Sequence, residues 1–180
     1  MRELSLHILD IAQNSISANA SLVQIIIEEN TAENLLSIEI IDNGKGMSPE
    51  FLKTVRDPFS TTRTTRKVGM GISLFEAAAI ACGGRLELDS KLGEGTTLKT
   101  YFKLDHIDRA PIGDMAGTIQ TLISGSPDID FIYRHSKDGK QFQLETTQLR
   151  NVLEGVPLDT PDVLSWISDY VTEGLSEISQ

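Results

Sequence analysis

The hydrophobic pattern of residues 3–104 changes period in a fixed order, and this order constrains the fold more than any other feature. Apolar residues recur at helical spacing in two segments and form β-rich runs in four others. The segments expected in chain order are a helix at 3–18, strands at 23–29 and 35–41, a loop with a short helix at 48–68, a helix at 69–81, and strands at 85–90 and 96–104. This order predicts an α+β fold built as a two-layer α/β sandwich.

A smaller region follows, because Pro111-Ile112-Gly113 interrupts the pattern. The elements expected there are a helix at 114–123, a hairpin at 131–146, and a last helix that Thr160 caps. Residues 105–180 carry 13 acidic and 5 basic side chains, whereas residues 1–104 carry 13 and 11. The sequence therefore predicts a core domain at 1–104 and an acidic α+β extension at 105–180.

The last expected helix carries an apolar stripe that has two interpretations. Such a stripe more often packs within its own domain, but it can also form the seam of a homodimer. The stripe consists of Leu164, Ile167, Val171, Leu175 and Ile178.

The composition excludes several classes of protein. A net charge of −10 and a pI near 4.7 argue against a broad basic surface for nucleic acid. No run approaches the length of a membrane span, and the first residues lack the pattern of a secretory signal, so we expect no membrane segment and a cytoplasmic location. Cys82 is the single cysteine, which leaves no disulfide framework.

Asp10 and Asn14 lie one helical turn apart, so a carboxylate and an amide project from one face of the first helix. An amide oxygen suits Mg²⁺, which keeps most of its waters and takes few protein ligands. A carboxylate can polarise a water or hydroxyl nucleophile. Taken alone, such a pair is more often a solvated polar face.

Asp42 stands at the end of the second strand, directly before Asn43-Gly44-Lys45-Gly46. Glycines there let the backbone pass close to a flat ring. A carboxylate at this place can accept a hydrogen bond from the adenine amino group, whereas the oxygen at the equivalent edge of guanine would be repelled. The alternative is a plain Asp-Asn-Gly turn, and the six residues 42–47 alone favour neither interpretation.

Two glycine-containing turns complete the set of local features. Gly69-Met70-Gly71 directs backbone N–H groups and the start of a helix toward a phosphate, although the Walker spacing is absent. Gly93-Glu94-Gly95-Thr96-Thr97 places a hydroxyl at the start of the last strand of the core. Each segment is also compatible with an ordinary tight turn.

Taken in order, these features resemble the GHKL superfamily of histidine kinases, gyrase-type topoisomerases and MutL proteins, whose ATP-binding core is the Bergerat fold. The resemblance covers residues 4–104 and includes five motifs in the order of the family. The motifs are the N box at 10–14, the G1 box at 42–47, the lid motif Pro58-Phe59-Ser60-Thr61-Thr62, the G2 box at 69–74, and Gly95-Thr96-Thr97.

The resemblance implies that the chain binds ATP and Mg²⁺. Asn14 would hold the Mg²⁺, Asp42 would bind adenine, and Gly46 would admit the ring. Thr97, in preference to Thr96, would support Asp42 directly or through water. The other expected binding residues are Gly44, Met47, Gly69, Met70 and Gly71, with Phe59, Thr62 and the phosphate-directed Arg63 and Lys67 in the lid.

The position four residues before the N-box asparagine distinguishes branches of the superfamily. By resemblance, histidine kinases usually carry Asn there, whereas the ATPases and serine-directed kinases carry Glu. This chain has Asp10, which keeps the carboxylate but reaches one methylene less, and it is the expected general base. Because only nine residues precede Asp10, we expect no upstream helical hairpin with an acceptor histidine. The strand and helix that usually precede the N box are either trimmed or replaced by the extension.

We therefore expect a stand-alone Mg·ATP-binding protein that phosphorylates a partner protein or slowly hydrolyses ATP. The alternative is a non-catalytic module in which ATP orders the lid and the acidic extension docks a partner. A DNA-acting ATPase is a third class, which the charge balance disfavours.

Overall fold

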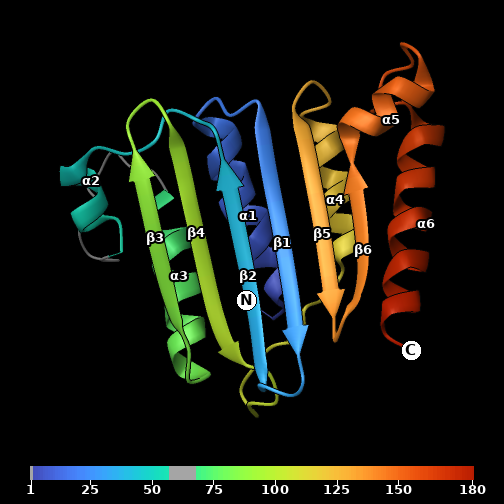
Figure 1. Cartoon of the computed structure of the whole chain (residues 1–180). Helices are drawn as coiled ribbons and strands as arrows, with labels where there is room; N and C mark the ends of the chain where they lie inside the picture. The colour runs from blue at the N-terminus through green and yellow to red at the C-terminus, as the bar shows by residue number, and fades with distance from the viewer. Residues whose placement is uncertain (1, 57–67) are drawn as a thin grey trace.

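A six-stranded mixed sheet carries the fold, and α1, α3 and α4 pack behind it in the view of Figure 1. The computed structural model describes residues 2–56 and 68–180. The strands are β1 (Leu22–Asn30), β2 (Leu35–Asp42), β3 (Arg85–Lys91), β4 (Gly95–Lys103), β5 (Asp130–Lys137) and β6 (Lys140–Glu145). The helices are α1 (Leu4–Ser17), α2 (Pro49–Thr54), α3 (Val68–Ala81), α4 (Met115–Gly125), α5 (Thr146–Leu153) and α6 (Pro161–Ile178). The predicted α+β fold, built as a two-layer sandwich of a sheet and helices, is confirmed.

The strand order is β3-β4-β2-β1-β5-β6. All neighbouring strands run antiparallel except β1 and β5, which run parallel. Asp42 at the end of β2 pairs with Val23 on one side and with Thr96 on the other. The end of β2 therefore lies inside the sheet, flanked by two strands, and not at a free edge.

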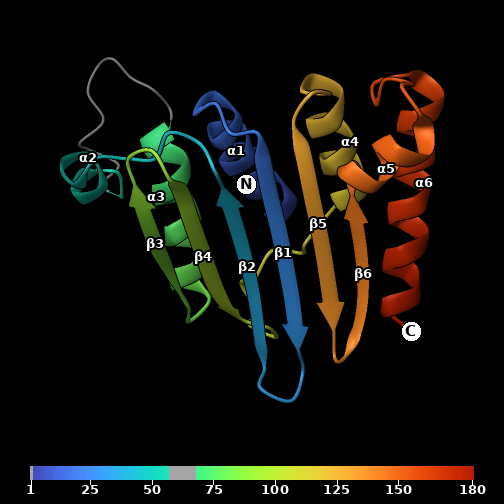
Figure 2. The ribbon, with the colours of Figure 1, turned by 45° about the horizontal axis from the view of Figure 1, so that its top comes forward.

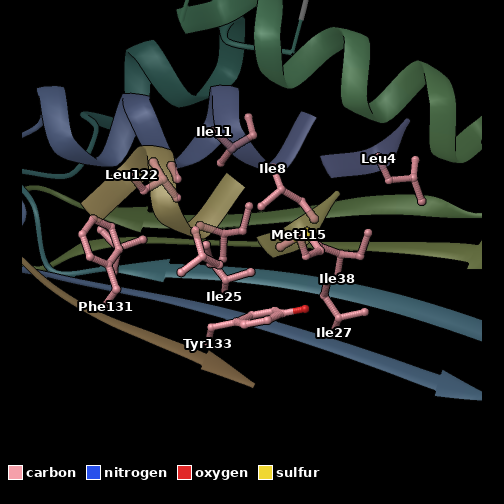
Figure 3. Packing of buried hydrophobic residues seen from close by; sticks show 14 of the residues in the cluster. Leu4, Ile8, Ile11, Ile25, Ile27, Ile38, Met115, Leu122, Phe131 and Tyr133 are labelled. Carbon is pink, nitrogen blue, oxygen red and sulfur yellow. The ribbon is translucent and has the colours of Figure 1, made fainter. Parts of the chain in front are cut away.

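The core forms between α1 and the sheet because both elements place apolar residues on one side (Figure 3). Leu4, Ile8 and Ile11 follow one stripe of α1 and are buried. Ile25 and Ile27 alternate with more exposed residues along β1, so they share the face of the sheet that the helices cover. Burial of each such side chain stabilises the fold by about 1.5–3 kcal/mol. This packing fixes α1, and with it the N box, against the strands.

The segment after residue 104 extends the same sheet. β5 pairs with β1 along its length, and α4 packs against both α1 and α6. A chain of buried hydrogen bonds joins the strands, since the Tyr133 hydroxyl contacts His135 Nδ1 at 2.8 Å and His135 Nε2 contacts Glu29 Oε2 at 2.8 Å. The hydrogen bond from His135 lowers the pKa of the Glu29 carboxyl. Residues on both sides of position 104 thus share one sheet, and the extension supplies the strand beside β1.

Two details of the extension differ from expectation. The short helix α5 was not predicted, because it buries little apolar surface and its first residue, Thr146, was assigned to the preceding strand. Thr160 is the N-cap residue of α6, but its hydroxyl donates to the Pro157 carbonyl instead of capping the helix.

The apolar stripe of α6 packs within its own chain, with Ile167 and Val171 fully buried. Within residues 2–56 and 68–180, no helix combines the length and hydrophobicity needed to cross a bilayer.

Candidate functional site

The elements that carry the predicted motifs meet at one end of the sheet. Figure 2 shows the C-terminal end of α1, the end of β2, the β3–β4 turn and the start of α3 gathered at the upper end of the strands. The N box lies on α1, the G1 box follows β2, and the G2 box opens α3. Segments that are distant in the chain therefore combine into one site, with Asp42 at the end of β2 between them.

The Asp42 carboxylate is held at both of its oxygens. The Ser15 hydroxyl donates to Oδ2 at 2.6 Å, and the Gly44 N–H donates to Oδ1 at 2.8 Å. Ser15 is buried in α1, so the helix fixes the orientation of the carboxylate. Each carboxylate oxygen can accept more than one hydrogen bond, and Asp42 keeps acceptor capacity for a ligand donor.

The loop after β2 lies against the end of α1. The Lys45 N–H donates to the Ala18 carbonyl at 2.8 Å, and a Cβ placed on Gly44 would lie only 2.7 Å from the same oxygen. The Asn43 side chain accepts from the backbone N–H groups of Ser21 at 2.8 Å and Leu22 at 3.0 Å. Glycine at position 44 is therefore required by the close approach of two backbone segments.

Gly46 also has a backbone role, which differs from the one that the resemblance implies. Its φ is +73°, and a Cβ there would overlap the carbonyl of Lys91 at the end of β3, directly before the β3–β4 turn. The Gly93 N–H of that turn donates to the Lys45 carbonyl at 2.7 Å, and the Met47 N–H donates to the Ser90 hydroxyl at 2.9 Å. The glycine lets the turn between β3 and β4 pack onto the G1 box. Entry of the adenine ring past Gly46 stays a prediction.

The register of β2 and β4 distinguishes the two threonines of the last motif. Asp42 pairs with Thr96, whereas Thr97 pairs with Ile41. Because side chains alternate along a strand, Thr96 lies on the face that carries Asp42 and Thr97 lies on the opposite face. The Thr96 hydroxyl contacts the Ser90 hydroxyl at 2.8 Å. The structure thus brings Thr96, in place of the expected Thr97, to the site.

Asp10 and Asn14 both face the start of α3. A Cβ placed on Gly71 would overlap the Asp10 carboxylate and would lie 3.7 Å from Asn14 Nδ2. Both side chains are half-buried. Asn14 Nδ2 is buried without a hydrogen-bond partner among the residues that the structure describes. The N box and the G2 box are therefore in contact, and the Asn14 Nδ2 group forms no hydrogen bond that would hold the fold.

This arrangement fits a Mg²⁺ that is bound mostly by water and phosphate. Outside residues 1 and 57–67, no three His, Cys, Asp or Glu side chains cluster to hold a metal. Mg²⁺ commonly takes only one or two protein ligands and completes its shell with substrate phosphates and water. The Asn14 amide oxygen, beside the Asp10 carboxylate, could supply one such ligand, whereas a closed protein cage is not formed by the described residues.

His7 lies two turns before Asn14 on α1 and remains neutral. Its ring stacks on Phe75 of α3 with centroids 4.9 Å apart and an interplanar angle of 10°. Burial lowers the pKa of His7 to about 4, because the charged form loses its hydration. His7 therefore joins the two helices that carry the N and G2 boxes, and at neutral pH it adds no charge there.

Six predicted binding residues are described only in part or not at all. The lid residues Phe59, Thr62, Arg63 and Lys67 lie outside the described residues, and Gly69 and Met70 are described only as backbone in the first turn of α3. Just before the gap, Arg56 forms an ion pair with Glu76 of α3 at 3.3 Å and donates to the Leu86 carbonyl of β3. The chain is thus anchored to α3 and β3 where it enters the segment of the predicted lid.

The structure adds two serines that the sequence interpretation did not select. Ser15 orients Asp42, and Ser90 joins Met47 to Thr96. The sequence does contain a signal for Ser15. It is a polar residue that continues the buried stripe of Leu4, Ile8 and Ile11, and a buried hydroxyl needs a hydrogen-bond partner. For Ser90 no such signal exists, since a serine near a β-turn is common.

Comparisons with known proteins identify the family of the chain. The model of the family "Histidine kinase-, DNA gyrase B-, and HSP90-like ATPase" matches residues 2–106. The chain is 30% identical to the histidine protein kinase DivJ of Caulobacter vibrioides over 101 residues, which is 54% of this chain and 17% of DivJ. It is 39% identical to the sensor protein SrrB of Staphylococcus aureus over 80 residues, which is 42% of this chain and 13% of SrrB. The matched regions thus span less than a fifth of either relative.

Among solved structures, the chain is similar to the Aquifex aeolicus MutL ATPase domain complexed with ADP. The TM-score is 0.49 at 14% sequence identity, and the match covers 86% of this chain and 70% of the other. The N-terminal domain of a DNA repair protein matches with a TM-score of 0.48 at 15% identity, covering 81% of this chain and 52% of that domain.

Proposed function

The chain belongs to the family of histidine kinase-, DNA gyrase B- and HSP90-like ATPases, and from this premise we propose that it binds Mg·ATP and transfers or releases the terminal phosphate. The acceptor in the proposed transfer is a side chain of a partner protein. The observation that carries the proposal is the Asp42 carboxylate, oriented by Ser15 and Gly44 beside the helix that presents Asp10 and Asn14. These four side chains and one N–H come from α1 and from the end of β2 with the loop that follows it.

Asp42 recognises the adenine. Its carboxylate accepts hydrogen bonds only, so it favours the amino group of adenine and disfavours the oxygen of guanine. The hydrogen bonds from Ser15 and Gly44 keep the carboxylate in one orientation before ATP arrives. Preorganisation of this kind raises affinity because less side-chain freedom is lost on binding.

The phosphates lie between the N box and the start of α3. The first N–H groups of a helix and its dipole favour an anion, and Gly71 lets α3 approach Asp10 and Asn14 without a side chain between them. Asn14 is the protein ligand proposed for Mg²⁺, which when bound neutralises phosphate charge. Arg63 and Lys67 are proposed to approach the phosphates from the lid.

Asp10 is the proposed general base. Its carboxylate adjoins Gly71 at the start of α3, the place assigned to the phosphates. From there it can accept a proton from a hydroxyl or water nucleophile, provided that the nucleophile comes within hydrogen-bonding distance. In the competing function the chain is an ATP-dependent docking module, and Asp10 has no part in turnover.

Incubation with γ-labelled ATP distinguishes these functions. The purified protein is mixed with cell lysate, and label is followed both on protein and as free phosphate. We expect transfer or release with the native chain, and loss of both in Asp10→Asn while calorimetry still detects ATP binding. Gln13→Ala, at an exposed position on the same helix, serves as the matched control. Unchanged turnover in Asp10→Asn would favour the docking module, and absence of ATP binding by the native chain would refute both.

A further inference from the structure

The outward side of α6 carries a pair of exposed aromatic rings. Trp166 and Tyr170 are 49% and 39% exposed, and their rings stack with centroids 4.9 Å apart at an interplanar angle of 10°. Exposed tryptophan and tyrosine are enriched where proteins bind one another, because they offer large contact area at a small loss of side-chain freedom. The α6 outer face consists of exposed residues only, namely Asp162, Trp166, Asp169, Tyr170, Glu173 and Glu177.

The aromatic pair is held in a fixed position by packing against β6. Tyr170 packs on Phe142 of β6 with ring centroids 5.2 Å apart. One turn further along α6, a Cβ on Gly174 would overlap the Phe142 ring, so the helix is seated tightly on β6. The rings of the α6 outer face are therefore held in place before any partner binds.

Carboxylates surround the two rings without compensating cations. α6 contains four acidic residues and no lysine or arginine. Asp169, Glu173 and Glu177 follow one another at spacings of four residues, where like charges on a helix repel. Within the part of the chain that the structure describes, no ion pair involves any carboxylate of α6. A cationic partner would remove this repulsion.

We propose that the α6 outer face docks a basic segment of a partner protein. Lysine or arginine side chains of the partner lie over the rings of Trp166 and Tyr170, where the ring faces attract cations, and pair with the neighbouring carboxylates. Figures 1 and 2 place α6 beside β6, at the opposite edge of the sheet from β3 and α3. The docking surface is thus separate from the nucleotide site, and the proposal holds whether or not the chain turns over ATP.

Trp166 makes the proposal directly measurable, because it is the only tryptophan of the chain. The probe is a synthetic peptide of alternating arginine and alanine, and the same peptide with glutamate in place of arginine is the reference. We expect the arginine peptide, and not the glutamate peptide, to change Trp166 fluorescence in a saturable way. The double variant Asp169→Lys/Glu173→Lys should weaken the arginine peptide by about tenfold or more.

A charge-matched variant separates this surface from the general acidity of the chain. Glu33→Lys/Glu94→Lys reverses two exposed charges in the β1–β2 and β3–β4 turns and should leave peptide affinity within about twofold. Equal weakening in both double variants would overturn the proposal, and so would sedimentation showing that a second copy of the chain covers the face. ATP binding by Asp169→Lys/Glu173→Lys is measured in parallel and should stay unchanged. Loss of peptide binding at the α6 outer face can therefore be distinguished from damage to the nucleotide site.

Discussion

The Ser15 hydroxyl donates a 2.6 Å hydrogen bond to Asp42 Oδ2, and it thereby joins the residue after Asn14 to the end of β2. Adjacent residues of α1 thus contact two parts of the proposed site: Asn14 lies beside Gly71 at the start of α3, and Ser15 holds Asp42, the proposed adenine acceptor. Because Ser15 is buried, the bond forms in a region with little competing water. The helix thus fixes the position of Asn14, the proposed metal ligand, relative to Asp42, the proposed adenine acceptor.

Ser15→Ala should weaken ATP binding by roughly fivefold, which corresponds to about 1 kcal/mol, the usual net contribution of a hydrogen bond. The Asp42 carboxylate would keep the Gly44 N–H but lose its fixed orientation. Calorimetric titration with ATP checks the effect, and Ser17→Ala, at an exposed position of α1, is the control. Wild-type affinity in Ser15→Ala would show that the bond has no influence on the nucleotide.

Asp42→Asn should weaken ATP binding by about 1.5–3 kcal/mol, or roughly 10–150-fold. The amide can present a donor where the adenine amino group needs an acceptor, and it also meets the donors from Ser15 and Gly44. The control is Asp89→Asn, an exposed position on β3 that pairs with Thr97 on the opposite face of the sheet. Full-strength binding by Asp42→Asn would remove this residue from the site.

The sequence predicted the core of the fold because its signals are local. Apolar periodicity in α1, a mostly apolar segment in α3 and β-rich runs in the strands identified every helix and strand between residues 4 and 104. The choice between Thr96 and Thr97 could not be made from the sequence. It depends on the register between β2 and β4, which is set by pairing between distant segments and decides the face on which each side chain lies. α5 was missed because its contacts are polar: Thr146 bonds Phe131 N–H at 2.8 Å and Asp130 at 2.9 Å.

Asn14→Ala should eliminate the dependence of ATP affinity on magnesium. The variant removes the amide proposed as the protein ligand, and the described residues offer no cluster that could replace it. ATP affinity is measured with magnesium and with a chelator, in the native chain and in Gln13→Ala, whose side chain is exposed on the same helix. If magnesium strengthened binding equally in Asn14→Ala, the metal role would belong to another group.

Gly46→Ala should destabilise the fold by at least about 1 kcal/mol more than Gly93→Ala. Both glycines have positive φ, +73° and +81°, so both substitutions carry the strain of a left-handed backbone. Only Gly46 also meets a neighbour, the Lys91 carbonyl, whereas nothing lies within 4 Å of a Cβ on Gly93. Urea unfolding of the two variants separates the shared backbone strain from the overlap at Gly46. Equal losses in the free energy of unfolding would show that the Lys91 carbonyl can move away at no cost.

His7 should make the protein less stable as the pH falls from about 6.5 toward about 4. Burial lowers the folded pKa to about 4 from the ordinary value of 6.5, so in this window the unfolded chain binds the proton and the folded chain does not. Integrated over the window, the loss is about 3 kcal/mol in free energy of unfolding. Above about pH 6.5 the contribution of neutral His7 to the free energy of unfolding is fully present. Below about pH 4 His7 is protonated in both the folded and the unfolded chain, so it no longer makes stability depend on pH.

His7→Phe keeps a ring beside Phe75 but cannot be protonated, so its urea midpoint should depend less on pH between about 6.5 and about 4 than that of the native chain. Carboxylates elsewhere titrate equally in both proteins, and the difference between the two curves isolates His7. His106→Gln, which removes a less buried histidine outside α1, is the control for the loss of an imidazole. Parallel curves for the native chain and His7→Phe would mean that the imidazole is protonated as readily in the folded protein as in the unfolded chain.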